Sequence, residues 1–134
     1  MPSTLGGIVA QLPYSIELHD STLAAVRMED GTAVVELRPA YIHRDAKGWT
    51  QDADLRIGNA QVDLAGVDLP AELADGRIKS KLGPYHNLLE LPLDVPGPLT
   101  VTLEVVFSEE LIRIAGDGAK VVLHGDPTYV EDVA

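Results

Sequence analysis

The sequence predicts an all-β protein, an antiparallel β-sandwich or flattened barrel with at most one short helix. Asp30 and Gly31 lie between two runs of alternating apolar and polar residues, which is a strong signal for a β-hairpin. Alternation also extends from Leu99 to Phe107, and short apolar runs recur every ~8–12 residues between glycine and proline turns. With 134 residues, 46% of them hydrophobic, the chain is expected to form a single domain over residues 1–134.

The composition narrows the classes of function. Acidic residues outnumber basic ones 21 to 10, which gives a net charge of −11. Such a surface disfavours nucleic acid and anionic membranes and favours a basic protein or a cation. The chain has no cysteine, so disulfides, thiol catalysis and cysteine-ligated metals are excluded. Because Met1–Gly7 has no signal-peptide pattern and no apolar run reaches membrane length, we expect a cytoplasmic location.

The first hairpin spans residues 22–38. A two-residue turn at Asp30 and Gly31 places the apolar residues of both strands on one face, whereas a slip of one residue would mix the faces. The predicted partners are Glu29 with Thr32, Val26 with Val35, Ala25 with Glu36, and Ala24 with Leu37.

Extending this register brings two polar segments together. It sets Asp20 opposite Tyr41 and His19 opposite Ile42, and Pro39 is expected to introduce a bulge. The sequence therefore predicts a polar cluster at the end of the first hairpin.

The segments around this hairpin are less regular. Residues 8–18 predict one or two short strands interrupted by a proline. Strands are expected at Trp49–Ile57 and Ala60–Leu64. Residues 68–76, with Pro near the start and Gly at the end, predict a short helix or a loop, and residues 79–87 predict an exposed connection.

The last third predicts a three-stranded meander over residues 99–124, with turns near Ser108 and at Asp117. In this register Glu104 lies opposite Arg113, and Ile114 lies opposite Val121. The predicted buried face consists of Leu103, Val105, Ile112, Ile114, Val121 and Leu123.

His19, Asp20 and Ser21 are the residue types of a hydrolase triad, but their spacing argues against that role. Neighbours on a strand point to opposite faces, and the sequence has no Gly-x-Ser-x-Gly elbow. Local hydrogen bonding by Asp20 or Ser21 is therefore the preferred interpretation.

The polar cluster nevertheless offers candidate ligands. A metal would take His19, Asp20 and His43, because imidazole and carboxylate groups suit zinc and other divalent ions. A small ligand would enter between Tyr41, Trp49 and Arg44. The full candidate set is His19, Asp20, Ser21, Tyr41, His43, Arg44, Trp49, Asp52 and Asp54. His86 and His124 are interpreted as ordinary surface histidines.

The motif at residues 18–23, Leu-His-Asp-Ser-Thr-Leu, followed by the hairpin and by residues 37–44, resembles small uncharacterised bacterial β-rich proteins with an apolar-His-Asp-Ser signature. Some of these resemble immunity proteins of polymorphic toxins, which are small and acidic. The resemblance implies no catalytic residues and favours a role without catalysis.

Two functions therefore follow from the sequence. The first is a non-enzymatic, acidic protein-interaction domain that binds a protein partner or a second copy of itself as a homodimer. The alternative is a small-ligand or divalent-metal binding protein, or a hydrolase, with its site at the end of the first hairpin. No cofactor motif is found, and no cofactor is expected.

Overall fold

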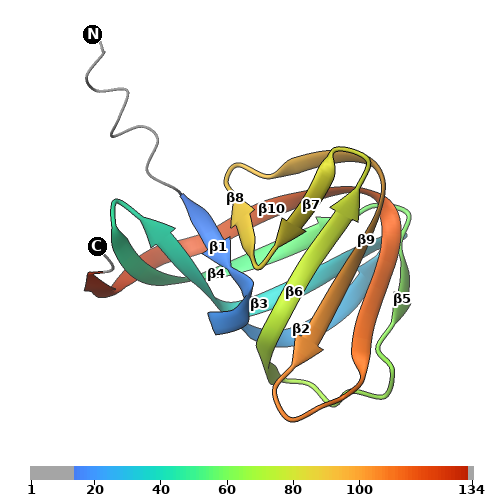
Figure 1. The fold of residues 1–134 in the computed structure, drawn as a ribbon, viewed down its shortest axis with the longest axis horizontal. Helices are drawn as coiled ribbons and strands as arrows, with labels where there is room; N and C mark the ends of the chain where they lie inside the picture. Colours follow the sequence, from blue (N-terminus) through green and yellow to red (C-terminus); the bar gives the residue numbers. More distant parts are fainter. Residues whose placement is uncertain (1–13, 133–134) are drawn as a thin grey trace, which may run out of the picture.

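A computed structural model describes residues 14–132, in which ten antiparallel strands form one sheet that closes on itself (Figure 1). The elements are β1 (Ser15–Glu17), the 3-10 helix η1 (Leu18–Asp20), β2 (Thr22–Glu29), β3 (Thr32–Arg44), β4 (Lys47–Ile57), β5 (Gln61–Asp63), β6 (Ala71–Ser80), β7 (Gly83–His86), β8 (Leu88–Glu90), β9 (Asp94–Val105) and β10 (Leu111–Asp132). Because β2 pairs with both β3 and β6, the path β2, β6, β9, β10, β4, β3 returns to its start. The predicted all-β sandwich or flattened barrel is confirmed.

The barrel interior is filled by alternate residues of the long strands. Leu55 and Ile57 from β4, Leu103 from β9, and Ile112 and Ile114 from β10 are all at most 1% exposed. Each such side chain contributes about 1.5–3 kcal/mol when it is fully buried. The polar residues between them face outward, so the period of two in the sequence specifies the inner face.

The first hairpin forms as predicted. Asp30 and Gly31 adopt φ of 50° and 82°, the left-handed conformations of a two-residue hairpin turn. The pairs Glu29–Thr32, Val26–Val35 and Ala25–Glu36 are present. A bulge then puts Leu23, instead of Ala24, opposite Leu37, so that one predicted pair is wrong.

The predicted continuation of this register is wrong by three residues. Residues 18–20 form η1 rather than strand, so that Glu17, not Asp20, lies opposite Tyr41. Ile16, not His19, lies opposite Ile42. β2 and then β1 pair along the same edge of β3. Between them, the bulge in β2 and the η1 turn use three residues more than the facing part of β3, which shifts the register by three. The expected bulge near Pro39 is present as a register shift between β3 and β4.

The prediction of a helix or loop over 68–76 and of a connection over 79–87 is also wrong. β6 and β7 occupy most of these residues, all except 68–70, 81, 82 and 87, and pair with each other. A bulge between Leu73 and Asp75 interrupts the alternation of β6, which hides the strand in the sequence. Gly76 lies beneath Leu18, where a Cβ would come within 2.6 Å of the leucine Cδ1.

The predicted meander over 99–124 is wrong, because β10 continues straight through Asp117 and Gly118. Gly118 takes a φ of 93° and its carbonyl accepts a hydrogen bond from Gly58 N–H at 3.1 Å. The dipeptide thus marks a register shift in the pairing of β10 with β9, and on the other side of β10 it marks the change of partner strand from β5 to β4.

The register between β9 and β10 also differs from the prediction. Leu111, not Arg113, lies opposite Glu104, because the connecting loop is longer than two residues. Of the predicted inner face, the residues of β9 and the first half of β10 are buried, and Val121 and Leu123 are partly buried.

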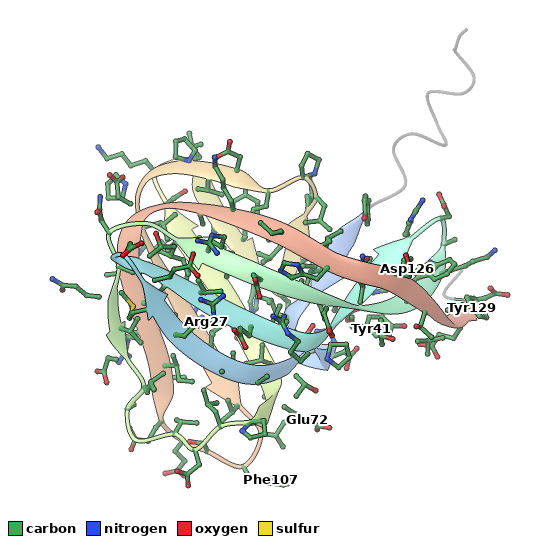
Figure 2. The ribbon with its side chains drawn as sticks, turned by 180° about the vertical axis from the view of Figure 1, so that it is seen from behind. Arg27, Tyr41, Glu72, Phe107, Asp126 and Tyr129 are labelled. Carbon is green, nitrogen blue, oxygen red and sulfur yellow. The ribbon has the colours of Figure 1, made fainter. Side chains whose placement is uncertain are left out.

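The ends of β3, β4 and β10, residues 41–50 and 128–132, extend beyond the barrel as an arm, and β1 pairs with β3 at its base along residues 41–43 (Figures 1 and 2). The Trp49 and Tyr129 rings meet edge to face at 5.5 Å. Tyr41 Oη donates to Glu131 Oε2 at 2.6 Å and crosses above Gly48, where a Cβ would lie 2.0 Å from the hydroxyl. Any larger residue at this position would therefore displace the Tyr41 side chain.

Part of the expected strand within residues 8–18 is found as β1. Residues 8–13 and the N-terminal segment Met1–Gly7 lie outside the described residues. Within residues 14–132, no helix has the length and apolar character needed to cross a membrane.

Candidate functional site

The site begins with the outer face of β1. Ile16 points into the core, so alternation turns Ser15 and Glu17 to the opposite face. Ser15 lies opposite His43, and Glu17 opposite Tyr41, which makes Glu17 and His43 diagonal neighbours on that face. His43 Nε2 donates to Glu17 Oε2.

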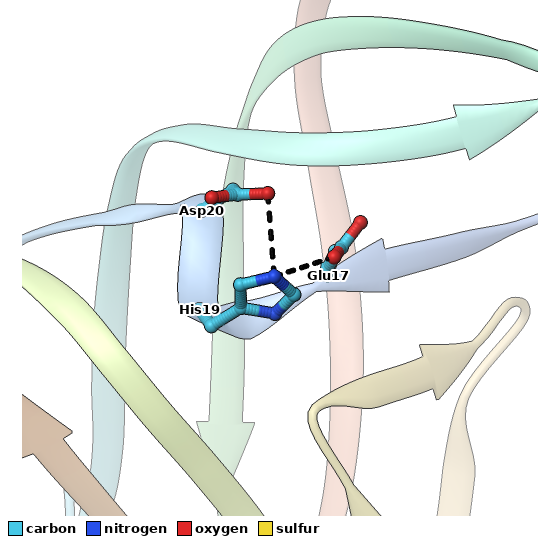
Figure 3. A group of neighbouring side chains, drawn as sticks. All are labelled: Glu17, His19 and Asp20. Atoms are coloured by element: carbon cyan, nitrogen blue, oxygen red, sulfur yellow. Dashed lines mark ion pairs between the residues drawn. The ribbon is translucent and has the colours of Figure 1, made fainter. Parts of the chain in front are cut away.

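The η1 turn brings a second histidine to the same carboxylate (Figure 3). His19 Nε2 lies 2.7 Å from Glu17 Oε1 and 3.4 Å from Asp20 Oδ2. Residues three apart eclipse each other on a 3-10 helix, which places Glu17 and Asp20 on one side of the turn. The potential ligand atoms of these three residues all lie within 4.8 Å of one another.

Backbone and hydroxyl hydrogen bonds fix the turn. Leu18 is buried, and its N–H donates to the Asn87 carbonyl at 2.7 Å. Ser21 Oγ donates to the Glu17 carbonyl at 2.8 Å and accepts from Tyr41 N–H at 2.9 Å. The Ser21 hydroxyl thus joins β1 to β3 where the strand pairing is interrupted, and both bonds withdraw it from a role as a nucleophile.

A pocket of about 490 Å³ opens over this cluster and is called the histidine pocket below. Its lining residues are Ser15, Glu17, His19, His43, His86, Asn87 and Leu88. Within residues 14–132, three buried side-chain polar atoms have no hydrogen-bond partner, and all belong to this lining: Ser15 Oγ, His19 Nδ1 and Asn87 Oδ1. An unpaired buried polar group costs about 1–3 kcal/mol, so three at one place call for a functional explanation.

The pocket is electrostatically suited to a cation or a hydrogen-bond donor. The Glu17 side chain is only 15% exposed, and the Asp20 carboxylate lies beside it. His86, at the edge of the pocket, is paired with Asp75 at 2.8 Å. A negative group at the centre and a strongly acidic chain around it both disfavour an anion.

A second pocket, of about 520 Å³, lies at the other end of the barrel, near Arg56, Pro96 and Lys120. It is slightly larger, but it contains no histidine and none of the unpaired buried atoms. The histidine pocket is therefore preferred for its polar groups, although its volume is slightly smaller.

Three of the predicted ligand residues, Tyr41, Arg44 and Trp49, lie in the arm and outside the histidine pocket. Trp49 packs on Tyr129, and Arg44 lies 5.5 Å from the centre of the Tyr14 ring. Burial and the hydrogen bond to the Glu131 carboxylate raise the pKa of Tyr41 well above its usual value. The predicted mouth between Tyr41, Trp49 and Arg44 does not line the histidine pocket.

Asp52 and Asp54 lie on the barrel wall. Asp54 is 4% exposed, and its carboxylate accepts hydrogen bonds from Arg38 Nη2 at 2.9 Å and His124 Nε2 at 2.7 Å. Burial alone would raise the pKa of Asp54, but these two hydrogen bonds outweigh it and hold the pKa below its usual value. Asp52 lies opposite His124 in the register and lines a separate, open hollow.

The structure thus brings together only part of the predicted set. Of the metal alternative, His19 and Asp20 converge, while His43 reaches the far oxygen of Glu17. Glu17, the residue that joins them, was missed in the sequence. The signal was present as Glu-Leu-His-Asp over residues 17–20, once those residues are placed on a tight turn.

Comparison of the chain with protein-family models, curated proteins and solved structures finds no match.

Proposed function

We propose that the chain is a non-enzymatic binding protein that takes a small polar ligand, positively charged or rich in hydrogen-bond donors, in the histidine pocket. One observation carries this proposal: the three unpaired buried polar atoms of the described residues all belong to residues that line one pocket, and Glu17 lines the same pocket. A ligand that pairs with these atoms would recover the cost of burying them. Of the two functions predicted from the sequence, this geometry favours the small-ligand alternative.

The chemistry of the lining favours binding over catalysis. The Ser21 hydroxyl is held by two hydrogen bonds, and the Ser15 hydroxyl has no base within hydrogen-bond reach among residues 14–132. Leu88, which lies opposite Glu17 on β8 and is 47% exposed, supplies an apolar wall. The pocket therefore combines an apolar side with a few convergent polar groups, as small-ligand sites do.

The test is a titration with a panel of small amines, amino acids and polyols in the presence of a chelator, followed by amide NMR shifts. We expect saturable shifts confined to β1, η1 and residues 86–88. Leu88→Trp, which fills the pocket, should abolish them. Leu82→Trp, at a 70% exposed position outside the pocket, is the matched control and should leave them unchanged. Shifts that are absent, or that persist in Leu88→Trp, would contradict the proposal.

A protein-interaction domain, of the immunity-protein kind or as a homodimer, is the second candidate. It is favoured by the edge of β10, whose pairing with β9 ends at Lys120. Beyond it, residues 121–132 have a partner strand only on the β4 side within the described chain. Val122, Tyr129 and Val130 are 41–50% exposed along this edge. An open edge of this kind is able to accept a strand from another chain.

The charge of −11 favours a basic partner over nucleic acid or an anionic membrane, and we infer a cytoplasmic location for either candidate. Light scattering across micromolar concentrations tests the homodimer. A mass that stays at one chain throughout would refute it. If a dimer forms, Val130→Lys should dissociate it, because a lysine on a sheet edge opposes strand addition.

A further inference from the structure

We propose that the cluster of Glu17 and His19, in the lining of the histidine pocket, with Asp20 beside them is a binding site for a divalent transition-metal ion. Glu17, His19 and Asp20 are its ligands, and His43 positions Glu17. The inference rests on the proposed function in one respect, the choice of this pocket. It adds the class of ion and assigns a role to each residue.

The spacing of the donor atoms fits such an ion. Bonds of ~2.0–2.1 Å in a tetrahedral shell place the ligand atoms about 3.3 Å apart. His19 Nε2 and Asp20 Oδ2 are 3.4 Å apart, and His19 Nε2 and Glu17 Oε1 are 2.7 Å apart. An outward movement of Glu17 Oε1 by well under 1 Å would therefore make room for the ion.

The backbone prepares this arrangement before any ion binds. All three ligands come from four consecutive residues, Glu17 at the end of β1 and His19 and Asp20 on η1, so no distant segment has to be brought in. The turn is fixed by the Ser21 hydroxyl and by the bond from Leu18 N–H to Asn87. Figure 3 shows the carboxylates of Glu17 and Asp20 both in contact with the same ring nitrogen of His19.

His43 has the geometry of an orienting group. Its Nε2 contacts Glu17 Oε2, leaving Oε1 turned toward His19. Partners that hold a ligating carboxylate in place raise metal affinity by about 10–100-fold. Since the ring of His43 is itself packed edge to face on Tyr41 at 5.3 Å, its orientation is set from β3.

The donor set selects the class of ion. One imidazole and two carboxylates suit Zn²⁺ or Mn²⁺, whereas Mg²⁺ prefers an all-oxygen shell and the soft ion Cu⁺ prefers sulfur. The two carboxylates also supply the negative charge that a dication neutralises. Because Glu17 and His19 line the pocket, a water molecule or the organic ligand within it would complete the shell.

Calorimetric titration of the full chain with ZnCl₂, after removal of chelator, is the test. We expect one ion per chain, comparable binding of Mn²⁺ and no binding of Mg²⁺ at the same concentrations. Glu17→Gln and His19→Gln should each weaken Zn²⁺ by more than about 100-fold, since each loses a direct ligand. His43→Ala should weaken it about 10-fold, and His43→Gln, which keeps a donor toward Glu17, should restore most of the loss.

His124→Gln is the matched control, because His124 also bonds a carboxylate but lies outside the pocket, and its Zn²⁺ affinity should equal that of the wild type. Thermal unfolding in chelator verifies that each variant is folded. Absence of Zn²⁺ binding, or equal affinity in the wild type and Glu17→Gln, would overturn the metal site. The organic panel is titrated in chelator, so the two proposals can fail separately. If the panel binds but Zn²⁺ does not, only the metal site is contradicted. If Zn²⁺ binds but the panel does not, only the organic ligand is contradicted.

Discussion

Two carboxylates in this protein each contact two basic side chains, yet their surroundings differ in one decisive respect. Asp54 accepts from Arg38 and His124, and none of the atoms of that cluster is left buried and unpaired. Glu17 contacts His19 and His43, but it lines a pocket whose other lining residues carry the three unpaired buried atoms. We call the Asp54 cluster closed, because all its buried polar atoms are paired and it stabilises the fold without a ligand. We call the Glu17 cluster open, because unpaired buried atoms cost free energy that a ligand can recover.

The largest difference between the two clusters is expected in stability. Asp54→Ala should lower the free energy of unfolding by about 2 kcal/mol, because it leaves Arg38 and His124 without their buried partner. Arg38 is itself partly exposed, which keeps the loss below that of a fully buried pair. Glu17→Gln should cost less than about 1 kcal/mol, since the amide still accepts a hydrogen bond from either histidine. Urea unfolding measures both, and equal losses would show that the clusters do not differ in kind.

Ser21→Ala is expected to have the next largest effect, a loss of about 1–2 kcal/mol in the same assay. The substitution removes a hydroxyl that bonds both the Glu17 carbonyl and Tyr41 N–H. It should also weaken Zn²⁺ binding, because η1 would no longer be held against β3. A variant that loses stability but keeps wild-type affinity would show that the turn is fixed by Leu18 and Asn87 alone.

These residues also show how far the sequence alone leads. Alternation predicted the closed all-β fold and the first hairpin correctly, because the inner face of each long strand follows a period of two. Alternation did not predict β6, because a bulge and Gly76 interrupt its period. The Asp117-Gly118 dipeptide, which is typical of a turn, lies instead within a continuous strand at the point where that strand changes partner.

The sequence predicted that His19, Asp20 and His43 lie near one another, and in the structure all three surround Glu17. Glu17 itself was missed because the predicted register was wrong by three residues. The sequence could not predict which buried polar atoms would lack a hydrogen-bond partner. Whether Ser15 Oγ is buried depends on β3 and β8, which come from distant parts of the chain.

The closed cluster should also carry a pH dependence. The pKa of Asp54 is lower in the folded protein than in the unfolded chain, so on acidification the unfolded chain takes up the proton first. The contribution of Asp54 to the free energy of unfolding is therefore complete above about pH 4. It is lost as the pH falls through the lower pKa that Asp54 has in the folded protein. The stability difference between the wild type and Asp54→Asn should shrink as the pH is lowered from about 6 to about 3.

Urea midpoints across this range provide the measurement. Asp45→Asn is the control, because that carboxylate is 69% exposed and only loosely paired with Arg44. A wild-type advantage over Asp54→Asn that remains constant down to about pH 3 would contradict the assignment of the pH dependence to Asp54.

The smallest effect, and the one that separates the two clusters most sharply, is expected for Ser15→Ala. Removing a buried hydroxyl normally destabilises a protein because its partner is left unpaired, as predicted for Ser21. Ser15 Oγ has no partner among the described residues, so its removal should leave the free energy of unfolding unchanged or raise it by up to about 1 kcal/mol. The same variant should weaken the organic ligand, if that ligand pairs with Oγ. A loss of more than about 1 kcal/mol in ligand-free protein would mean that the hydroxyl is already satisfied, and that the Glu17 cluster is as closed as that of Asp54.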